Sequence, residues 1–198
     1  MKIILATNNK HKVGEIKKIL KLKGLEILSL LDFPQKFVPR ENGKTFEENA
    51  YKKARAAAKK YGMTAVADDS GLCVDALHGC PGVNSSRFVR PPVTAVRLCE
   101  KILKVMKNVP HSKRRARFIT AVAIVEPGGK AHKVIGSCSG RIIDEMRGSC
   151  GFGYDSVFIP KGHKLTFAEM SLSNKNAISH RGSAFRKARH LLAELIKK

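Results

Sequence analysis

Residues 3–24 read IILATNNKHKVGEIKKILKLKG. A short apolar run comes first, and a polar segment follows it. Apolar residues then recur at the spacing of one helix face, at Val13, Ile16, Ile19 and Leu20. The glycine that follows, Gly24, is a typical helix stop. The stretch therefore predicts a strand, a loop and a helix, which together begin the β-α-β unit of an α/β sheet.

The rest of the chain adds both parallel and antiparallel connections. Helices are predicted for residues 45–62, 95–106 and about 184–195, and strands for residues 25–31, 64–67, 72–77, 118–125, 130–137, 141–144 and 156–159. Two predicted capping boxes pair Thr45 with Glu48 and Thr166 with Glu169. The turn at residues 126–129 indicates an antiparallel hairpin. The expected fold is therefore α/β, with a mixed sheet flanked by helices.

The order of these elements also predicts how the chain divides. Residues 1–198 are expected to form a single catalytic domain of two lobes. The two ends of the chain form one lobe, and residues 72–145 contribute much of the other. A ligand is then expected in the cleft between the lobes. With 43% apolar residues the chain can bury a core, so disorder is not expected.

Composition also limits where the protein works. No apolar run approaches the roughly 18 residues of a membrane helix, and the N-terminal apolar run is too short for a signal peptide. The five cysteines are an odd number without a C-x-x-C pair, so neither a disulfide framework nor a zinc site is expected. We therefore expect a cytoplasmic protein with reduced cysteines and no contact with a membrane.

The net charge of +22 predicts a polyanionic partner. Nucleotides and nucleic acids fit that description equally well. The basic residues are spread over nearly every segment and form no compact stripe. A generic solvated surface is therefore an alternative interpretation of the charge.

The polar segment after the first strand is a candidate phosphate site. Backbone N–H groups at a helix start bind anions, and this segment adds side-chain donors in Thr7, Asn8, Asn9, Lys10, His11 and Lys12. Lysines at the positive end of a helix dipole are unfavourable unless an anion binds there. The segment lacks the glycines of a P-loop, and in so basic a chain accidental placement is the alternative.

Three carboxylates form a candidate metal site. Asp68 and Asp69 follow a buried strand, where adjacent negative charges need compensation, and Glu41 is the third. Hard oxygen ligands favour Mg²⁺. Because side chains alternate along a strand, only one of the two aspartates is expected to contact the metal directly. The alternative is that they cap a turn at Ser70 and Gly71.

Two further segments could contact a flat base. Residues 151–155 read GFGYD, in which the glycines allow close approach of the backbone and Phe152 could stack on a ring. The alternative places Phe152 in the core. Near the last helix, Lys175, His180 and Arg181 offer donors for carbonyl or phosphate oxygens, unless they are ordinary surface residues.

Taken together, these segments closely resemble the inosine triphosphatase-like family of pyrophosphatases for non-standard purine nucleotides. The motifs that carry the resemblance run in order from residue 3 to about residue 190: Thr7-x-Asn9-x-x-Lys12, Thr45-Phe-x-Glu-Asn49-Ala50, Asp68-Asp-Ser-Gly71, Pro81-Gly82 with Ser86-Arg87, Gly151-Phe-Gly-Tyr-Asp155 and Ser179-His-Arg-Gly182. The resemblance implies a two-lobed fold with a long mixed sheet, a homodimer, Mg²⁺ as cofactor, and hydrolysis of dITP, ITP and XTP that cleanses the nucleotide pool.

The resemblance also implies roles for single residues. Asp69 is implied as the proton acceptor for the attacking water and, with Glu41, as a ligand of Mg²⁺, whereas a role for Asp68 is less firmly implied. The implied substrate contacts are Thr7 to Lys12 for the triphosphate, Lys53 for phosphate or acid, Ser70, and a nucleoside pocket of Phe152, Gly153, Tyr154, Asp155, Lys175, His180 and Arg181. Ser156 departs from the proline of many relatives, and a locally looser loop is expected there.

Two other functions compete with this one. A basic nucleic-acid-binding protein would explain the charge, although no concentrated basic face or binding module is recognisable. A phosphatase that releases orthophosphate would use similar residues. The products formed from ITP and Mg²⁺ distinguish all three.

Overall fold

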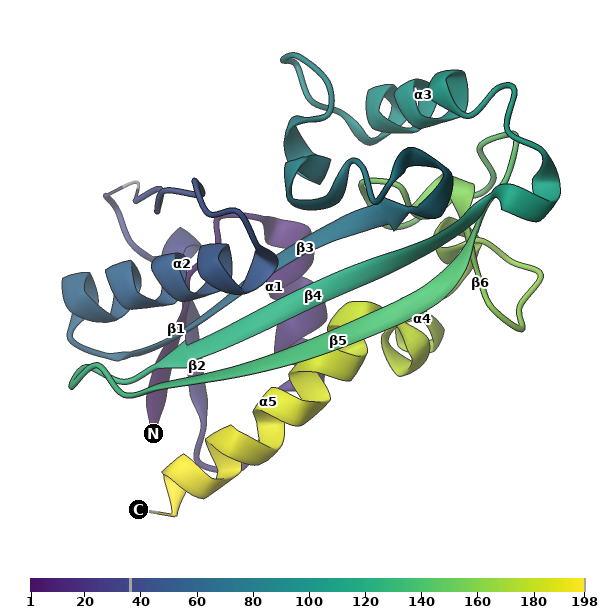
Figure 1. Ribbon diagram of the computed structural model, residues 1–198. Coiled ribbons are helices and arrows are strands. Elements are labelled where there is room, and N and C mark those ends of the chain that lie inside the picture. The colour runs from purple at the N-terminus through teal and green to yellow at the C-terminus, as the bar shows by residue number, and fades with distance from the viewer. Residues whose placement is uncertain (36, 198) are drawn as a thin grey trace. The chain divides into compact units, whose positions relative to one another are not determined.

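The computed structural model describes residues 1–35 and 37–197. Its strands are β1 (Lys2–Leu5), β2 (Glu26–Ser29), β3 (Thr64–Val74), β4 (Arg115–Val125), β5 (Ala131–Ile142) and β6 (Phe158–Pro160) (Figure 1). Its α-helices are α1 (Lys10–Ile19), α2 (Phe46–Tyr61), α3 (Ala95–Val105), α4 (Leu172–Ile178) and α5 (His180–Ile196). The strands form a sheet in the order β2-β1-β3-β4-β5-β6. Because β1 runs parallel to β2 and β3 while β5 runs antiparallel to β6, the predicted α/β fold with a mixed sheet is confirmed.

The chain divides into two compact units. The first comprises Met1–Asp69, Thr120–Gly136 and Arg181–Lys198, and the second comprises Ser70–Ile119 and Ser137–His180. Each unit has a hydrophobic core of its own. The predicted lobes and the cleft expected between them stay predictions.

In the first unit, α1 and α5 share a core with β1, β3 and β4. The buried members from the two helices and from Leu20, which caps α1, are Ile16, Leu20, Ala184, Phe185, Ala188 and Leu192. Leu191 and Leu195 pack against the same core, and the helix predicted at about 184–195 lies within α5. Full burial of an Ile, Leu or Phe side chain stabilises a fold by about 1.5–3 kcal/mol, so this face holds α5 in place.

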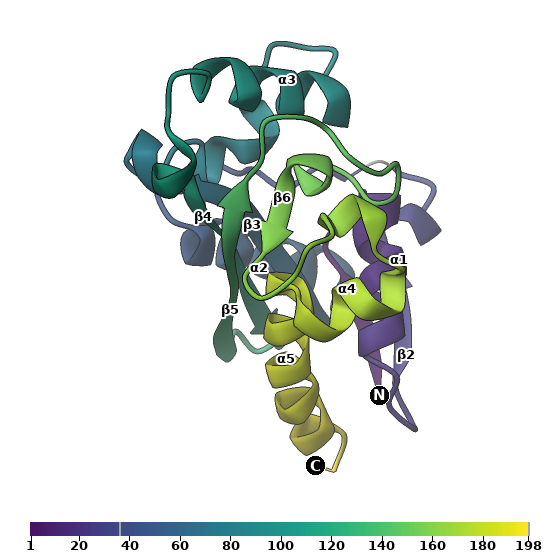
Figure 2. The ribbon, with the colours of Figure 1, turned by 90° about the vertical axis from the view of Figure 1, so that its right-hand side faces the viewer.

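The second unit has a core rich in aromatic rings. Phe118 on β4 lies 4.8 Å from Phe158 on β6 and 5.9 Å from Phe167, measured between ring centroids. Leu98 and Ile102 on α3 complete the buried face of that helix. Figure 2 shows the short β6 beside the end of β5, where their antiparallel pairing brings Phe158 into this core.

The ends of α2 follow their sequence signals with one difference. Thr45 Oγ1 accepts a hydrogen bond from Glu48 N, and α2 ends at Gly62 in the left-handed conformation. The Glu48 carboxylate, however, accepts from Lys44 N, so the box predicted there is only half formed. At Thr166 the predicted box is complete, but it opens a 3₁₀ helix of three residues.

Several predicted boundaries were wrong. The strands predicted at 64–67 and 72–77 form a single strand, β3, and a 3₁₀ turn occupies residues 75–77. The strand predicted at 141–144 is only the end of β5, and residues 155–157 form a 3₁₀ turn before β6. The first helix begins at Lys10, inside the segment predicted as loop, and ends at Ile19, before the predicted stop at Gly24. Helix α4 was not predicted.

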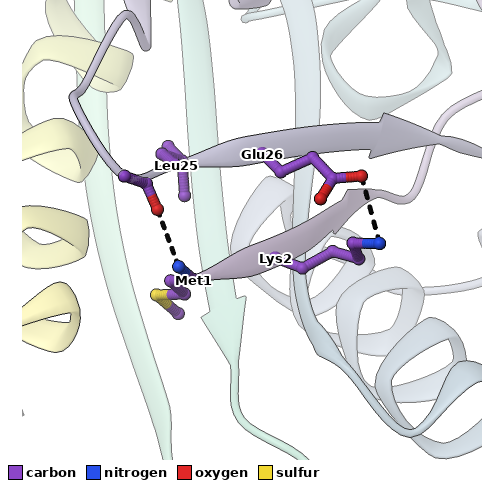
Figure 3. A pocket seen from close by; sticks show the side chains of 5 residues that line it. Met1, Lys2, Leu25 and Glu26 are labelled. Carbon is purple, nitrogen blue, oxygen red and sulfur yellow. Dashed lines mark hydrogen bonds and ion pairs between the residues drawn. The ribbon is translucent and has the colours of Figure 1, made fainter.

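The β1–β2 edge carries a shallow hollow that contains none of the predicted site residues. There the Met1 ammonium donates to the Gly24 carbonyl at 2.7 Å, and Lys2 pairs with Glu26 at 3.1 Å (Figure 3). None of the helices that the structure describes has the length and apolar sequence needed to cross a membrane. The five cysteines are free thiols.

Candidate active site

The predicted phosphate segment lies at the N-terminus of α1, in the first unit. Asn9 is the N-cap, and its Oδ1 accepts from His11 N at 3.0 Å and from Lys12 N at 3.2 Å. Asn8 Nδ2 donates to the Phe37 carbonyl at 2.8 Å, and Thr7 Oγ1 accepts from Asn9 N at 3.2 Å. The segment therefore satisfies several of its own polar groups. An anion bound there would compete with the Asn9 cap for the amides of α1.

Asp68 lies at the centre of a buried network of charges in the first unit. Its Oδ2 is 2.8 Å from Lys12 Nζ and 3.5 Å from Arg181 Nη2. Arg181 Nη1 also donates to Glu15 Oε2 at 2.6 Å. Burial would raise the pKa of Asp68, but Lys12 and Arg181 outweigh burial and hold that pKa well below its ordinary value. Asp68 is therefore ionised and well compensated.

Asp69 belongs to a different group of side chains in the same unit. Its Oδ2 accepts from Asn49 Nδ2 at 3.0 Å, and its Oδ1 accepts from Lys53 Nζ at 3.3 Å. Lys53 Nζ also donates to Glu41 Oε1 at 2.6 Å. Burial raises the pKa of Asp69, because the opposing effects of Lys53 and Asn49 are smaller. Asp69 is thus less well compensated than its neighbour.

The loop that carries Glu41 is tied to α2 through Gly43. Asn49 Oδ1 accepts from Gly43 N at 2.7 Å, while its amide nitrogen donates to Asp69. A Cβ on Gly43 would lie 2.8 Å from Asn49 Oδ1, closer than two such atoms approach. The close approach therefore requires glycine, and Asn49 joins the loop to the strand.

The two aspartates meet different partners because β3 continues through them. Asp68 contacts Lys12 and Arg181, whereas Asp69 contacts Asn49 and Lys53. This divergence agrees with the alternation predicted for a strand. The alternative in which the acids cap a turn at Ser70 and Gly71 is wrong, since both residues belong to β3.

In the second unit, residues 151–155 form a tight loop, called here the glycine loop. Asp155 Oδ2 accepts from Phe152 N at 2.8 Å and from Lys175 Nζ at 2.7 Å. Gly151 has φ +80°, and a Cβ there would collide with the Asp155 carboxylate. Lys175 Nζ lies 4.9 Å from the centroid of the Phe152 ring. Phe152 is half-buried rather than enclosed in the core, and its face is close to a cation.

Tyr154 and His180 occupy buried positions in the second unit. The Tyr154 hydroxyl donates to the Ser85 carbonyl at 2.8 Å, and this hydrogen bond ties the glycine loop to Ser85. His180 stacks on Phe118, with ring centroids 4.6 Å apart and planes 11° apart. The alternative in which His180 and Arg181 are ordinary surface residues is wrong, because both are buried. Ser70 is half-buried on β3.

A family model now matches this combination of motifs along nearly the whole chain: the model of the Ham1 family covers residues 3–191. The chain belongs to the Ham1 family. The family resemblance drawn from the motifs is thereby confirmed.

Relatives and solved structures agree with this membership. The dITP/XTP pyrophosphatase of Desulforamulus reducens is 48% identical over 195 residues, which cover 98% of this chain and 97% of that protein. A solved HAM1 protein from Coxiella burnetii superimposes with a TM-score of 0.88 at 37% identity and covers 98% of this chain and 99% of that one. A nucleoside-triphosphatase, or dITP/XTP pyrophosphatase, from Mycobacterium abscessus gives a TM-score of 0.75 at 39% identity, with coverage of 95% and 98%.

The carboxylates of this Ham1-family chain have the oxygen donors that a divalent cation prefers, but they do not form a complete set of ligands. Within residues 1–35 and 37–197, no group of three or more His, Cys, Asp or Glu side chains is close enough to hold a metal ion. Glu41 and Asp69 instead share one ammonium, that of Lys53. Two hard carboxylates that already share a cation suit Mg²⁺. Asp68 suits it less, since Lys12 and Arg181 already neutralise it.

Sequence reasoning assigned no role to two residues that organise this Ham1-family site. Glu15 is a buried acid in a strongly basic helix, and it holds Arg181. Asn49 is a buried amide among the alanines of α2, and it holds Asp69. The available signal was the same in both: a polar residue on the apolar face of an amphipathic helix needs a partner.

Proposed function

We propose that this chain hydrolyses non-standard purine nucleoside triphosphates, such as dITP, ITP and XTP, to the monophosphate and pyrophosphate. The observation that carries the proposal is the group formed by Asp69, Asn49, Lys53 and Glu41, a poorly compensated carboxylate held beside a lysine. Support comes also from membership of the Ham1 family and from relatives named dITP/XTP pyrophosphatases at 43–48% identity.

We assign to Asp69 the task of orienting and deprotonating the attacking water. Attack at the α-phosphorus builds negative charge on the departing pyrophosphate, and buried lysines offset such charge. Lys53 is placed for this because its buried ammonium lies beside Asp69.

We further propose that Mg²⁺ is held by Glu41 and Asp69. When bound, Mg²⁺ would neutralise phosphate charge and strengthen the acidity of water. Asp69 holds the water's proton at its carboxylate, while Asn49 fixes the orientation of that carboxylate. Asp68 keeps Lys12 and Arg181 in place, and this role accounts for its ion pairs with these two residues.

We assign recognition of the base to the glycine loop and its partners. The half-buried ring of Phe152 offers a stacking surface, and Asp155 holds both the loop and Lys175. A donor aimed at a 6-keto oxygen would face the 6-amino group of adenine. Each buried group left unsatisfied in this way costs about 1–3 kcal/mol, which favours hypoxanthine and xanthine over adenine. The nucleoside contact predicted for Arg181 stays a prediction. In this structure the Arg181 guanidinium donates to Glu15 and Asp68.

The assembly and the compartment are proposals as well. A homodimer follows from the family resemblance and is checked by the mass of the protein in solution. A cytoplasmic location is supported by the five free thiols, which are typical of a reducing compartment.

The test is product analysis with ITP and Mg²⁺. Our proposal expects IMP and pyrophosphate in equal amounts. Release of orthophosphate would instead make the protein a phosphatase. If no product appears while the protein binds DNA or RNA, the nucleic-acid-binding alternative replaces it.

A further inference from the structure

A buried thiol of the second unit touches the middle of the glycine loop. Cys99 lies on α3 with 0% of its surface exposed. Its Sγ is 3.3 Å from the carbonyl oxygen of Gly153 and 3.3 Å from Oγ of Ser156. Ser156 was expected to loosen this region, but it contacts Cys99 through its hydroxyl and accepts from Arg147 N at 2.9 Å through its carbonyl.

The number of protons fixes the direction of these two hydrogen bonds. A thiol has one proton, and the Gly153 carbonyl can only accept, so the S–H group donates to Gly153. The Ser156 hydroxyl is then the donor to the sulfur. Burial raises the pKa of the Cys99 thiol, which keeps the proton in place at neutral pH.

The carbonyl of Gly153 lies in the middle of the glycine loop, where Cys99 holds it. Gly153 has φ +65°, and no atom lies within 4 Å of the position that a Cβ would take. Side-chain packing at Gly153 therefore does not hold this peptide in place. The Asp155 carboxylate fixes the amide of Phe152 on one side, and the Tyr154 hydroxyl is fixed to Ser85 on the other. Cys99 anchors the carbonyl between these two points.

We propose that Cys99, supported by Ser156, is a positioning residue that holds the Gly153 peptide and thereby orients the ring of Phe152 toward the nucleoside. The inference rests on the proposed role of Phe152. Cys99 itself contacts no substrate. Its effect should therefore appear in nucleotide affinity and leave turnover almost unchanged.

The experiment compares Cys99→Ala with two matched variants. Cys99→Ser keeps a donor, and Cys73→Ala removes another buried thiol of the same unit. Amide hydrogen exchange of residues 151–157 is measured on the free protein, and KM and kcat are measured with ITP. We expect Cys99→Ala to speed exchange and to raise KM about threefold to tenfold, the scale of one lost hydrogen bond, with kcat within about twofold. Cys99→Ser should recover most of the affinity, and Cys73→Ala should change neither quantity.

A double variant tests whether the two residues act together. Cys99→Ala with Ser156→Ala should resemble Cys99→Ala alone, because Ser156 acts through the sulfur. Unchanged exchange in Cys99→Ala would overturn the proposal. So would faster exchange with an unchanged KM, provided that Phe152→Ala raises KM. If Phe152→Ala leaves KM unchanged, the nucleoside role of Phe152 fails instead, and the exchange rates alone decide whether Cys99 holds the loop.

Discussion

At the scale of single residues, two adjacent aspartates have opposite electrostatic surroundings. Asp68 is ion-paired with Lys12 and Arg181, which lower its pKa, whereas burial raises the pKa of Asp69. A carboxylate that two cations already neutralise is a poor base and a poor metal ligand. The structure therefore gives the two acids different surroundings, and the proposed role of Asp69 as the reactive acid rests on this difference.

The first prediction concerns turnover. Asp69→Asn keeps the shape of the side chain and removes its charge and its proton acceptor, so kcat for ITP should fall by about 10²–10⁴. Nucleotide affinity should survive, because a negative charge near the phosphates is gone. Asp68→Asn should lose less turnover. The measurement is kcat and nucleotide Kd for both variants at saturating Mg²⁺, and a dead Asp68→Asn beside an active Asp69→Asn would reverse the assignment.

The second prediction concerns stability, which the two variants should lower by different amounts. Asp68→Asn leaves Lys12 and Arg181 buried without their shared carboxylate and should lower the free energy of unfolding by about 3–5 kcal/mol at pH 7. Asp69→Asn removes a charge that burial disfavours and leaves Lys53 paired with Glu41, so it should cost less stability than Asp68→Asn. Urea unfolding at pH 7 measures both.

The pH dependence provides the control for this prediction. Because the folded pKa of Asp68 is lowered, its contribution is complete above its unfolded pKa of about 4 and is lost as pH falls below that value. The difference in the free energy of unfolding between the wild type and Asp68→Asn should therefore become smaller at acidic pH. A gap that stays constant down to pH 3 would contradict the ion-pair argument.

At the scale of elements, two glycines predict opposite responses to the same substitution. Gly43→Ala forces a Cβ against Asn49 and should lower both the thermal midpoint and kcat, because Asn49 holds Asp69. Gly14 lies exposed in α1 with nothing within 4 Å of a Cβ. Gly14→Ala should therefore stabilise the protein by about 0.5–1 kcal/mol without affecting kcat. Thermal unfolding and ITP turnover are measured for both variants. Equal changes in thermal midpoint and kcat would contradict the argument that a Cβ at Gly43 collides with Asn49.

Elements with a strong local signal could be predicted from the sequence, and those that depend on distant partners could not. The helix from Thr45 to Gly62 has both a cap and a stop, and it was placed almost to the residue. The sequence predicts two strands where the structure has the single strand β3, because Asp68, Asp69 and Ser70 disfavour strands locally. Pairing with neighbouring strands overrides that preference. Likewise, Glu15 and Arg181 are 166 residues apart, so no local pattern could pair them.

At the scale of the whole molecule, the net charge of +22 acts on association rather than on the fold. The long-range field attracts an anionic substrate, and salt screens that field beyond about 10 Å at 0.1 M. Raising the KCl concentration from about 0.02 to 0.2 M should therefore raise KM for ITP while kcat stays nearly constant. Steady-state rates at fixed free Mg²⁺ test this, and the same KM at both salt concentrations would show that the charge does not assist binding.

The last prediction concerns removal of the metal. Lys53 already links Glu41 and Asp69, so the protein should remain folded without Mg²⁺. Excess EDTA should therefore abolish ITP hydrolysis without lowering the thermal midpoint, and added Mg²⁺ should restore activity. Glu41→Gln removes one of the two carboxylates and should raise the Mg²⁺ concentration needed for half-maximal rate, whereas Glu26→Gln, an exposed acid paired with Lys2, should not. Full activity in excess EDTA would contradict the role of the metal. A thermal midpoint that falls with EDTA would instead mean that the metal, rather than Lys53, holds Glu41 and Asp69 together.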